Sequence, residues 1–170
     1  ALTRVAGAGG GGGDGGGPAA AKPRASDHGA FYAPHLLMAD PVDPEAGLVP
    51  APPSGHVAGV YARVDAARGV HKAPANEPIR GAVDVTYRFN RQEQELLNPE
   101  GVNCLRVLTR LGLTIWGTRT LAANPEWRYV PVRRLFTMVI ESIRVGTRHV
   151  VFEPNTPETW AGIRRDVGAF

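Results

Sequence analysis

Apolar residues recur with the spacing of a helix in three parts of the chain. Between Ser54, a candidate N-cap, and Gly69, a candidate stop, they stand at i, i+3, i+4 and i+7. Thr156 and Pro157 occupy the N-cap and N1 positions of a last helix. The longest stripe follows Pro131 and is formed by Val132, Leu135, Phe136, Val139, Ile140 and Ile143. The pattern predicts three amphipathic helices.

Strand patterns lie before and between these helices. Residues 29–41 form an apolar run that ends at a proline, and the Pro-rich residues 42–53 predict loop or extended chain. Residues 83–89 alternate apolar and polar positions, and residues 104–117 offer two short strands around a Gly-containing turn. Residues 149–154 are a continuous apolar run, which predicts a strand buried on both faces.

The order of these elements predicts an α/β fold, a mixed sheet flanked by helices. Residues 1–26 are expected to be a flexible Gly-rich linker or loop, because residues 7–17 are almost all glycine and nothing there can offset the entropy of ordering. They lack the context of a phosphate-binding loop. Residues 27–170 are expected to form one domain, incomplete at its C-terminus because the last helix is still running at Phe170.

Composition narrows the class of protein. The 170 residues, of which 43% are hydrophobic, suffice for one domain with an ordinary core. The 19 basic and 16 acidic residues are scattered, without the basic block that nucleic-acid tails show, so no nucleic-acid partner is expected. No apolar run approaches the roughly 18 residues of a membrane span, so no direct membrane insertion is expected. The lone Cys104 indicates a chain kept in reducing cytoplasm.

The chemistry-bearing residues do not assemble a recognisable site. Cys104 with His56 or His71 would make a thiol nucleophile and its base, but a lone cysteine leading into a strand is usually a small buried hydrophobe. Glu153 follows the last predicted strand, where α/β enzymes often keep carboxylates. A small α/β enzyme centred on these two residues is therefore the alternative function. The histidines have no metal-ligand spacing, so neither a metal nor another cofactor is expected.

Five segments, in this order, resemble one family. They are "PPSGHVAGVYARVDAARGVHKAPAN", "LNPEGVNCLRV", "GLTIWGTRTL", "WRYVPVRRLF" and "VVFEPNTPETW". Together they look like the C-terminal, tube-proximal domain of the contractile tail sheath proteins of phages, R-type pyocins and phage-tail-like extracellular injection systems. The resemblance covers about residues 29–170, and the family pattern continues on both sides of this chain.

The resemblance implies a structural subunit without enzymatic activity. Such a subunit polymerises helically with copies of itself around an inner tube, and contraction drives the tube through a target envelope. In the family, terminal arms add strands to a neighbour's sheet, and baseplate and cap proteins bound the sheath. The resemblance also implies assembly in the cytoplasm and a place in a phage tail or a phage-tail-like particle that is released from the cell.

Two sets of contact residues are expected. In residues 69–83 two prolines keep the chain extended and Asn76 satisfies its own backbone, so that His71 and Lys72 either contact a neighbouring subunit or belong to a purely structural turn. Arginines on the polar faces of the two late helices form the second set: Arg133, Arg134, Arg144, Arg164 and Arg165. The first three are expected to pair internally with Glu141 or Glu153. Arg164 and Arg165 are expected to contact the tube through weak, releasable ion pairs.

Overall fold

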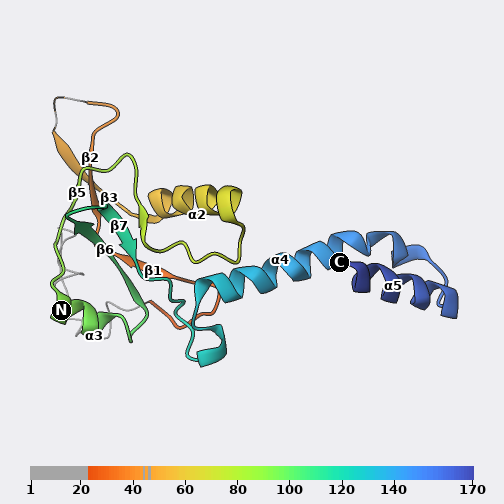
Figure 1. Cartoon of the computed structure of the whole chain (residues 1–170). Helices are drawn as coiled ribbons and strands as arrows, with labels where there is room; N and C mark the ends of the chain where they lie inside the picture. Colours follow the sequence, from red (N-terminus) through yellow and green to blue (C-terminus); the bar gives the residue numbers. More distant parts are fainter. Residues whose placement is uncertain (1–22, 44, 46) are drawn as a thin grey trace. The chain divides into compact units, whose positions relative to one another are not determined.

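The computed structural model describes residues 23–43, 45 and 47–170. The chain divides into two compact units, Ala1–Arg133 and Arg134–Phe170, and each is described by itself (Figure 1). Most of the predicted Gly-rich linker, residues 1–22, lies outside the described residues, so its flexibility stays a prediction.

The main sheet of the first unit is mixed. Its order is β1-β6-β7-β4, and its strands are β1 (Phe31–Ala33), β6 (Val102–Leu108), β7 (Gly112–Trp116) and β4 (Glu77–Pro78). β1 runs parallel to β6, whereas β6–β7 and β7–β4 are antiparallel. The predicted hairpin in residues 104–117 is therefore confirmed, with Gly112 at a positive φ of 69° beside the turn.

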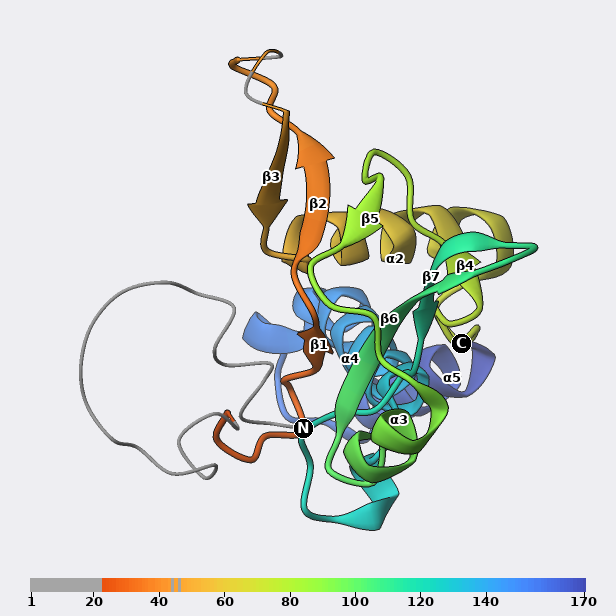
Figure 2. The same cartoon turned by 90° about the vertical axis from the view of Figure 1, so that its left-hand side faces the viewer.

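A second, antiparallel sheet has the order β3-β2-β5. Its strands are β3 (Leu48–Ala51), β2 (Leu36–Ala39) and β5 (Asp84–Val85). β2 and β3 form a hairpin that extends beyond the body of the unit in both views (Figures 1 and 2). The mixed α/β class predicted from the sequence is thus confirmed.

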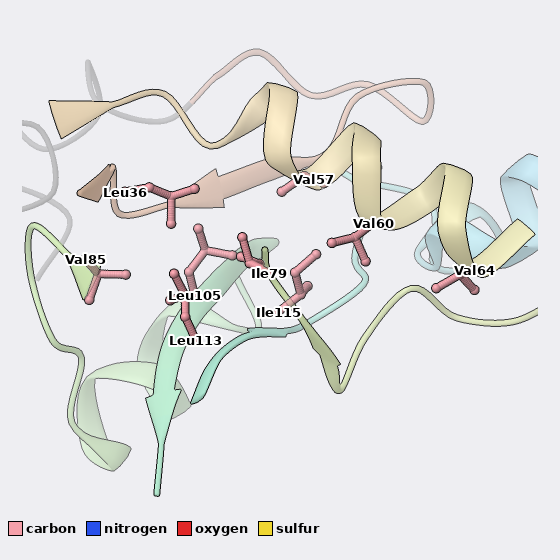
Figure 3. Close-up of a cluster of buried hydrophobic side chains, with 9 residues drawn as sticks. All are labelled: Leu36, Val57, Val60, Val64, Ile79, Val85, Leu105, Leu113 and Ile115. Carbon is pink, nitrogen blue, oxygen red and sulfur yellow. The ribbon is translucent and has the colours of Figure 1, made fainter. Parts of the chain in front are cut away.

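Helices flank the main sheet, because successive side chains of β6 point to opposite faces and each face packs against a different helix. Leu105 of β6 lies in one buried cluster with Val57, Val60 and Val64 of α2 (Ser54–Arg68), as Figure 3 shows. Cys104, its neighbour in β6, points to the other face, as alternation requires, and lies in a second cluster. That cluster includes Leu97, the last residue of the helix α3 (Arg91–Leu97), with Ala33, Phe89 and Val102.

A polar clamp closes the end of the sheet. Asn103 is fully buried in β6; its Nδ2 donates to the carbonyls of Phe31 (3.1 Å) and Arg119 (2.7 Å), and its Oδ1 accepts from the Arg119 N–H (2.7 Å). A Cβ at Gly117 would lie 2.8 Å from that oxygen, so only glycine fits there. A buried amide group that lacks hydrogen-bond partners destabilises the fold, and these three hydrogen bonds avoid that cost. No motif in the sequence singles out Asn103.

The second unit is helical. The helix α4 (Val130–Gly146) begins in the first unit and continues into the second, where a 3-10 helix η4 (Arg148–Phe152) and the helix α5 (Pro157–Ala169) follow. Thr156 caps α5 through its hydroxyl, which accepts from the Thr159 N–H at 3.4 Å, and Pro157 follows at N1. The predictions of both late helices are confirmed.

The predicted strand at residues 149–154 is wrong. The segment forms η4, and Val151 and Phe152 are exposed. A strand needs a neighbouring strand to satisfy its backbone, and among the described residues of this unit there is none. The expected parallel layer therefore reduces to the pair β1–β6.

Several element boundaries also differ from the predictions. The N-cap of α2 is Pro53, without a side-chain hydrogen bond, and Ser54 is already helical. The run 29–41 forms two strands in different sheets because Pro34 lacks the N–H that a continuous ladder needs. Of residues 83–89 only β5 is strand. The helix α3 was not predicted, although Asn90 and Glu93 close a capping box at its start.

Candidate assembly surface

The apolar stripe of α4 lies largely on the surface. Ile140, for example, keeps 58% of its surface exposed, and none of the residues from 134 to 170 is buried. The amphipathic pattern is therefore present in α4 without the core that such a pattern usually covers.

The rest of the second unit adds further exposed apolar side chains. Phe152 in η4 is 96% exposed, and Trp160 and Val167 lie exposed on α5. We call the whole set the α4–α5 apolar surface: Leu135, Phe136, Met138, Ile140, Val145, Val151, Phe152, Trp160, Val167 and Phe170. Soluble monomers rarely leave so much apolar surface in contact with water, and its presence marks an interaction surface.

Local polar contacts hold the ends of these helices in place. The Trp160 Nε1–H donates to Asn155 Oδ1 at 2.7 Å, which fixes the indole at the start of α5. The pKa of Glu158 is lowered by a backbone hydrogen bond and by the Thr156 hydroxyl, as suits a carboxylate in the first turn of a helix. His149 Nε2 lies 4.0 Å from Asp166 Oδ2, across from η4 to α5.

Of the arginines expected to pair internally, Arg144 and Arg133 have partners that the structure defines. Arg144 donates from Nε to Glu141 Oε2 at 2.7 Å and from Nη2 to Glu141 Oε1, and this hydrogen bonding lowers the pKa of Glu141. Arg133 instead lies 3.6 Å from Asp27 and 4.9 Å above the ring of Trp127. Arg144 therefore has Glu141, one of the two expected carboxylates, as its partner, whereas the partners defined for Arg133 are Asp27 and Trp127.

The arginines expected to contact the tube are both exposed on α5. Arg165 Nε lies 3.1 Å from the neighbouring Asp166 Oδ1, which partly neutralises it. Arg164 has no ion pair among the residues that the structure describes. The structure therefore leaves both guanidinium groups accessible, and their contact with a tube stays a prediction.

Residues 69–83 form an extended strip at the edge of the main sheet. Asn76 has a positive φ of 58°, and its N–H donates to the Ile115 carbonyl at 2.8 Å; β4 then pairs with β7. His71 is exposed with its ring against Gly69, whereas Lys72 is half-buried and donates to the Ala73 carbonyl at 2.8 Å. The Lys72 ammonium is therefore bound within its own turn, whereas the His71 ring is exposed to solvent.

The residues of the alternative enzyme site do not form one. Cys104 is fully buried, and burial raises the pKa of its thiol to about 11, which opposes formation of a nucleophilic thiolate. Glu153 is exposed and belongs to the other compact unit. Within the described residues no group of three metal-ligating side chains converges. None of the helices in the described part combines the length and apolarity that crossing a membrane requires.

Residues 24–121 match the family model described as the phage tail sheath protein central domain, more than half of the chain. The chain belongs to the phage tail sheath protein family. The resemblance had implied the C-terminal, tube-proximal domain, whereas the matched model is that of the central domain. Over 112 residues this sheath chain is 30% identical to a prophage major tail sheath protein of Pseudomonas aeruginosa (strain UCBPP-PA14), covering 59% of this chain and 27% of the relative.

Solved sheath structures match a larger part of the chain. A chain in the anti-feeding prophage (AFP) baseplate has a TM-score of 0.78 at 38% identity and covers 85% of this sheath chain. The PVC sheath complex of an extracellular contractile injection system, in its contracted state, gives 0.77 at 38% identity over 86%. The contracted AFP helical sheath gives 0.77 at 35% identity over 93%. This chain spans 38% to 42% of those chains.

Proposed function

We propose that this chain is part of a structural subunit of a contractile sheath. The subunit polymerises helically with copies of itself around an inner tube, and its contraction drives the tube through a target envelope. The observation that carries the proposal is the match to the contracted AFP helical sheath, which covers 93% of the chain at 35% identity. Residues 27–170 are the part of the subunit that lies toward the tube, and residues 1–26 link it to the preceding part.

The α4–α5 apolar surface supports an assembling protein rather than an independent enzyme. A fully buried Leu, Ile or Phe side chain contributes about 1.5–3 kcal/mol, so covering even a few members of this surface stabilises an assembly substantially. We propose that the surface is covered in the complete sheath and that the subunit has no enzymatic activity and no cofactor. Its partners are further copies, the inner tube, and the baseplate and cap proteins, in a particle assembled in the cytoplasm.

The test is electron microscopy of the full-length protein under assembly conditions. We expect tubes or cogwheel-like rings from the unmodified protein. Ile140→Asp with Phe152→Asp places charges on the α4–α5 apolar surface, so tubes should be lost while circular dichroism shows an unchanged fold. A control pair, Thr109→Asp with Arg110→Asp in the β6–β7 turn, should assemble normally. A full-length protein that stays monomeric would contradict the proposal.

Arg164 and Arg165 are our proposed contact with the inner tube. Exposed ion pairs contribute only about 0.2–1 kcal/mol each, so many of them hold register and still release together on contraction. Arg164→Glu with Arg165→Glu should leave sheath polymerisation intact and weaken its hold on the tube, measured by cosedimentation at rising salt. Unchanged salt resistance of the double variant would place the tube contact elsewhere.

A further inference from the structure

The tip of the β2–β3 hairpin is acidic and carries one exposed apolar side chain. Its members are Asp40, Val42, Asp43 and Glu45, which we call the acidic tip. Val42 is 90% exposed. Asp40 Oδ1 accepts from the N–H groups of Val42 (2.8 Å) and Asp43 (3.3 Å), which holds the turn in shape. Among the described residues no cation pairs with these carboxylates, so the tip projects uncompensated negative charge into solvent.

A groove of opposite character runs beside α2 in the same unit. Its volume is about 610 Å³, and its walls come from one side of α2 and from the chain that follows β4. We call it the α2 groove; it is lined by Gly55, His56, Gly59, Val60, Arg63 and Arg80. Its floor is largely apolar, and its titratable side chains are basic or imidazole groups without a carboxylate among them.

Arg80 is the cation that the groove offers to a partner. The neighbouring Arg63 is used internally, since it donates to the Pro78 carbonyl and lies 3.7 Å from Glu77 Oε2. Arg80 is exposed and makes no hydrogen bond or ion pair with any residue that the structure describes. A guanidinium beside an apolar floor suits a ligand that combines a carboxylate with a small apolar side chain.

The two glycines of the groove leave room for a partner to approach the helix backbone closely. Gly59 lies in the interior of α2, where glycine costs about 0.5–1 kcal/mol relative to alanine, and Gly55 lies in the first turn. A Cβ at Gly55 or Gly59 would meet nothing within 4 Å, so no packing within the described unit requires glycine there. The space beside these two glycines is therefore open to an incoming side chain.

We propose that the acidic tip of one copy docks into the α2 groove of another copy, with Val42 on the apolar floor and the carboxylates beside Arg80. The inference rests on the proposed sheath function and names a contact between its subunits. The hairpin extends away from α2 in both views, so a tip does not fill the groove of its own chain (Figures 1 and 2). Because tip and groove are different surfaces, the contact is heterologous and repeats along an open helix.

The experiment uses charge reversal in the full-length protein. Arg80→Glu in the groove and Asp43→Lys in the tip should each reduce the assembled fraction about tenfold in sedimentation and electron microscopy, because each places like charges at every copy of the contact. An equimolar mixture of the two variants should recover assembly. In the mixture, the groove of an Arg80→Glu copy can receive the tip of an Asp43→Lys copy. The unmodified groove of that Asp43→Lys copy can receive the unmodified tip of an Arg80→Glu copy.

Two matched control variants test whether the loss of assembly is specific to this contact. Arg68→Glu, near the end of α2 and outside the groove, and Glu126→Lys, away from the tip, should assemble normally, and all variants should keep the thermal midpoint of the unmodified protein. Normal assembly by Arg80→Glu or by Asp43→Lys would overturn the contact while leaving the sheath function standing. Loss of assembly without recovery in the mixture would also overturn it, since the groove would then hold a different partner. Failure of the unmodified protein to form tubes would overturn both proposals.

Discussion

The two compact units of the chain use apolar residues in opposite ways. In the first unit, Leu105 and Ile115 of the mixed sheet and Leu36 of the second sheet are completely buried in one cluster with the valines of α2. In the second unit, α4 and α5 carry an apolar stripe of comparable regularity, yet none of their residues from 134 onward is buried. An amphipathic pattern therefore specifies that a face needs a cover; it does not specify whether the cover lies in the same unit.

The difference also separates stability from assembly. The first unit has the layers and the buried side chains that stabilise a domain without help. The second unit has helix caps and ion pairs, which contribute only modestly to stability. Its apolar surface stabilises the protein only when another surface covers it. We therefore expect mutations in the core of the first unit to act on folding and mutations of the α4–α5 apolar surface to act on polymerisation.

Hydrogen exchange should show the largest contrast between the units. In the unassembled chain, amides of β6 should exchange only through global unfolding, whereas amides of α5 should exchange about a thousandfold faster or more through local opening. Assembly should slow α5 exchange and leave β6 unchanged. Mass spectrometry of the unassembled and assembled protein measures both, and equal protection of the two elements before assembly would refute the comparison.

Truncating one aliphatic residue in each unit should affect stability in the first and assembly in the second. Leu105→Ala removes a fully buried side chain from the larger core and should lower the free energy of unfolding by about 3–5 kcal/mol. Ile140→Ala, on the exposed face of α4, should change it by less than about 0.5 kcal/mol while reducing tube formation. Urea unfolding and electron microscopy test the pair, and a large stability loss at Ile140 would show that the second unit has a core of its own.

The fully buried amide of Asn103 should matter more than the half-buried amide of Asn98. Asn103→Ala leaves the Arg119 N–H without its acceptor and should cost about 2–3 kcal/mol. The same change at Asn98, at the end of α3, should fall within about 0.5 kcal/mol of the unmodified protein. The midpoints of urea unfolding measure both effects. An unchanged midpoint for Asn103→Ala would mean that water replaces the hydrogen bonds of Asn103.

The buried thiol offers a smaller, pH-dependent test. Burial raises the pKa of Cys104 from 9.0 to about 11, so the folded chain retains a proton that the unfolded chain loses. Stability due to this group is complete below pH 9 and falls as the pH rises toward 11, by about 1 kcal/mol at pH 10. Subtracting the unfolding profile of Cys104→Ala isolates this slope, and a difference profile that is flat above pH 9 would show an accessible thiolate.

Local patterns in the sequence predicted the elements whose periodicity is long and whose ends carry caps. The stripe after Pro131 and the pair Thr156–Pro157 specified α4 and α5, and the two short strand patterns around a Gly-containing turn in residues 104–117 specified β6 and β7. The same reasoning failed at residues 149–154, because an apolar run of that length suits either a buried strand or an exposed interface.

The candidate site was less predictable. The exposed arginines of α5 follow from its helical faces, but neither the α2 groove nor the acidic tip was found, because a groove depends on segments brought together from separate parts of the chain. The lining residues Gly59 and Arg80 show no shared spacing that a pattern search detects.

By itself, then, the sequence determined which faces are apolar, where the main helices end and, through its ordered segments, the family to which the chain belongs. Only the tertiary structure decided which apolar faces meet. It placed Leu105 and Val60 in one core and left Ile140 in water, although all three stand in equally regular patterns. The physical reason is that periodicity is a local property of a helix or strand, whereas burial depends on what lies opposite, and that is set by the topology of the whole unit.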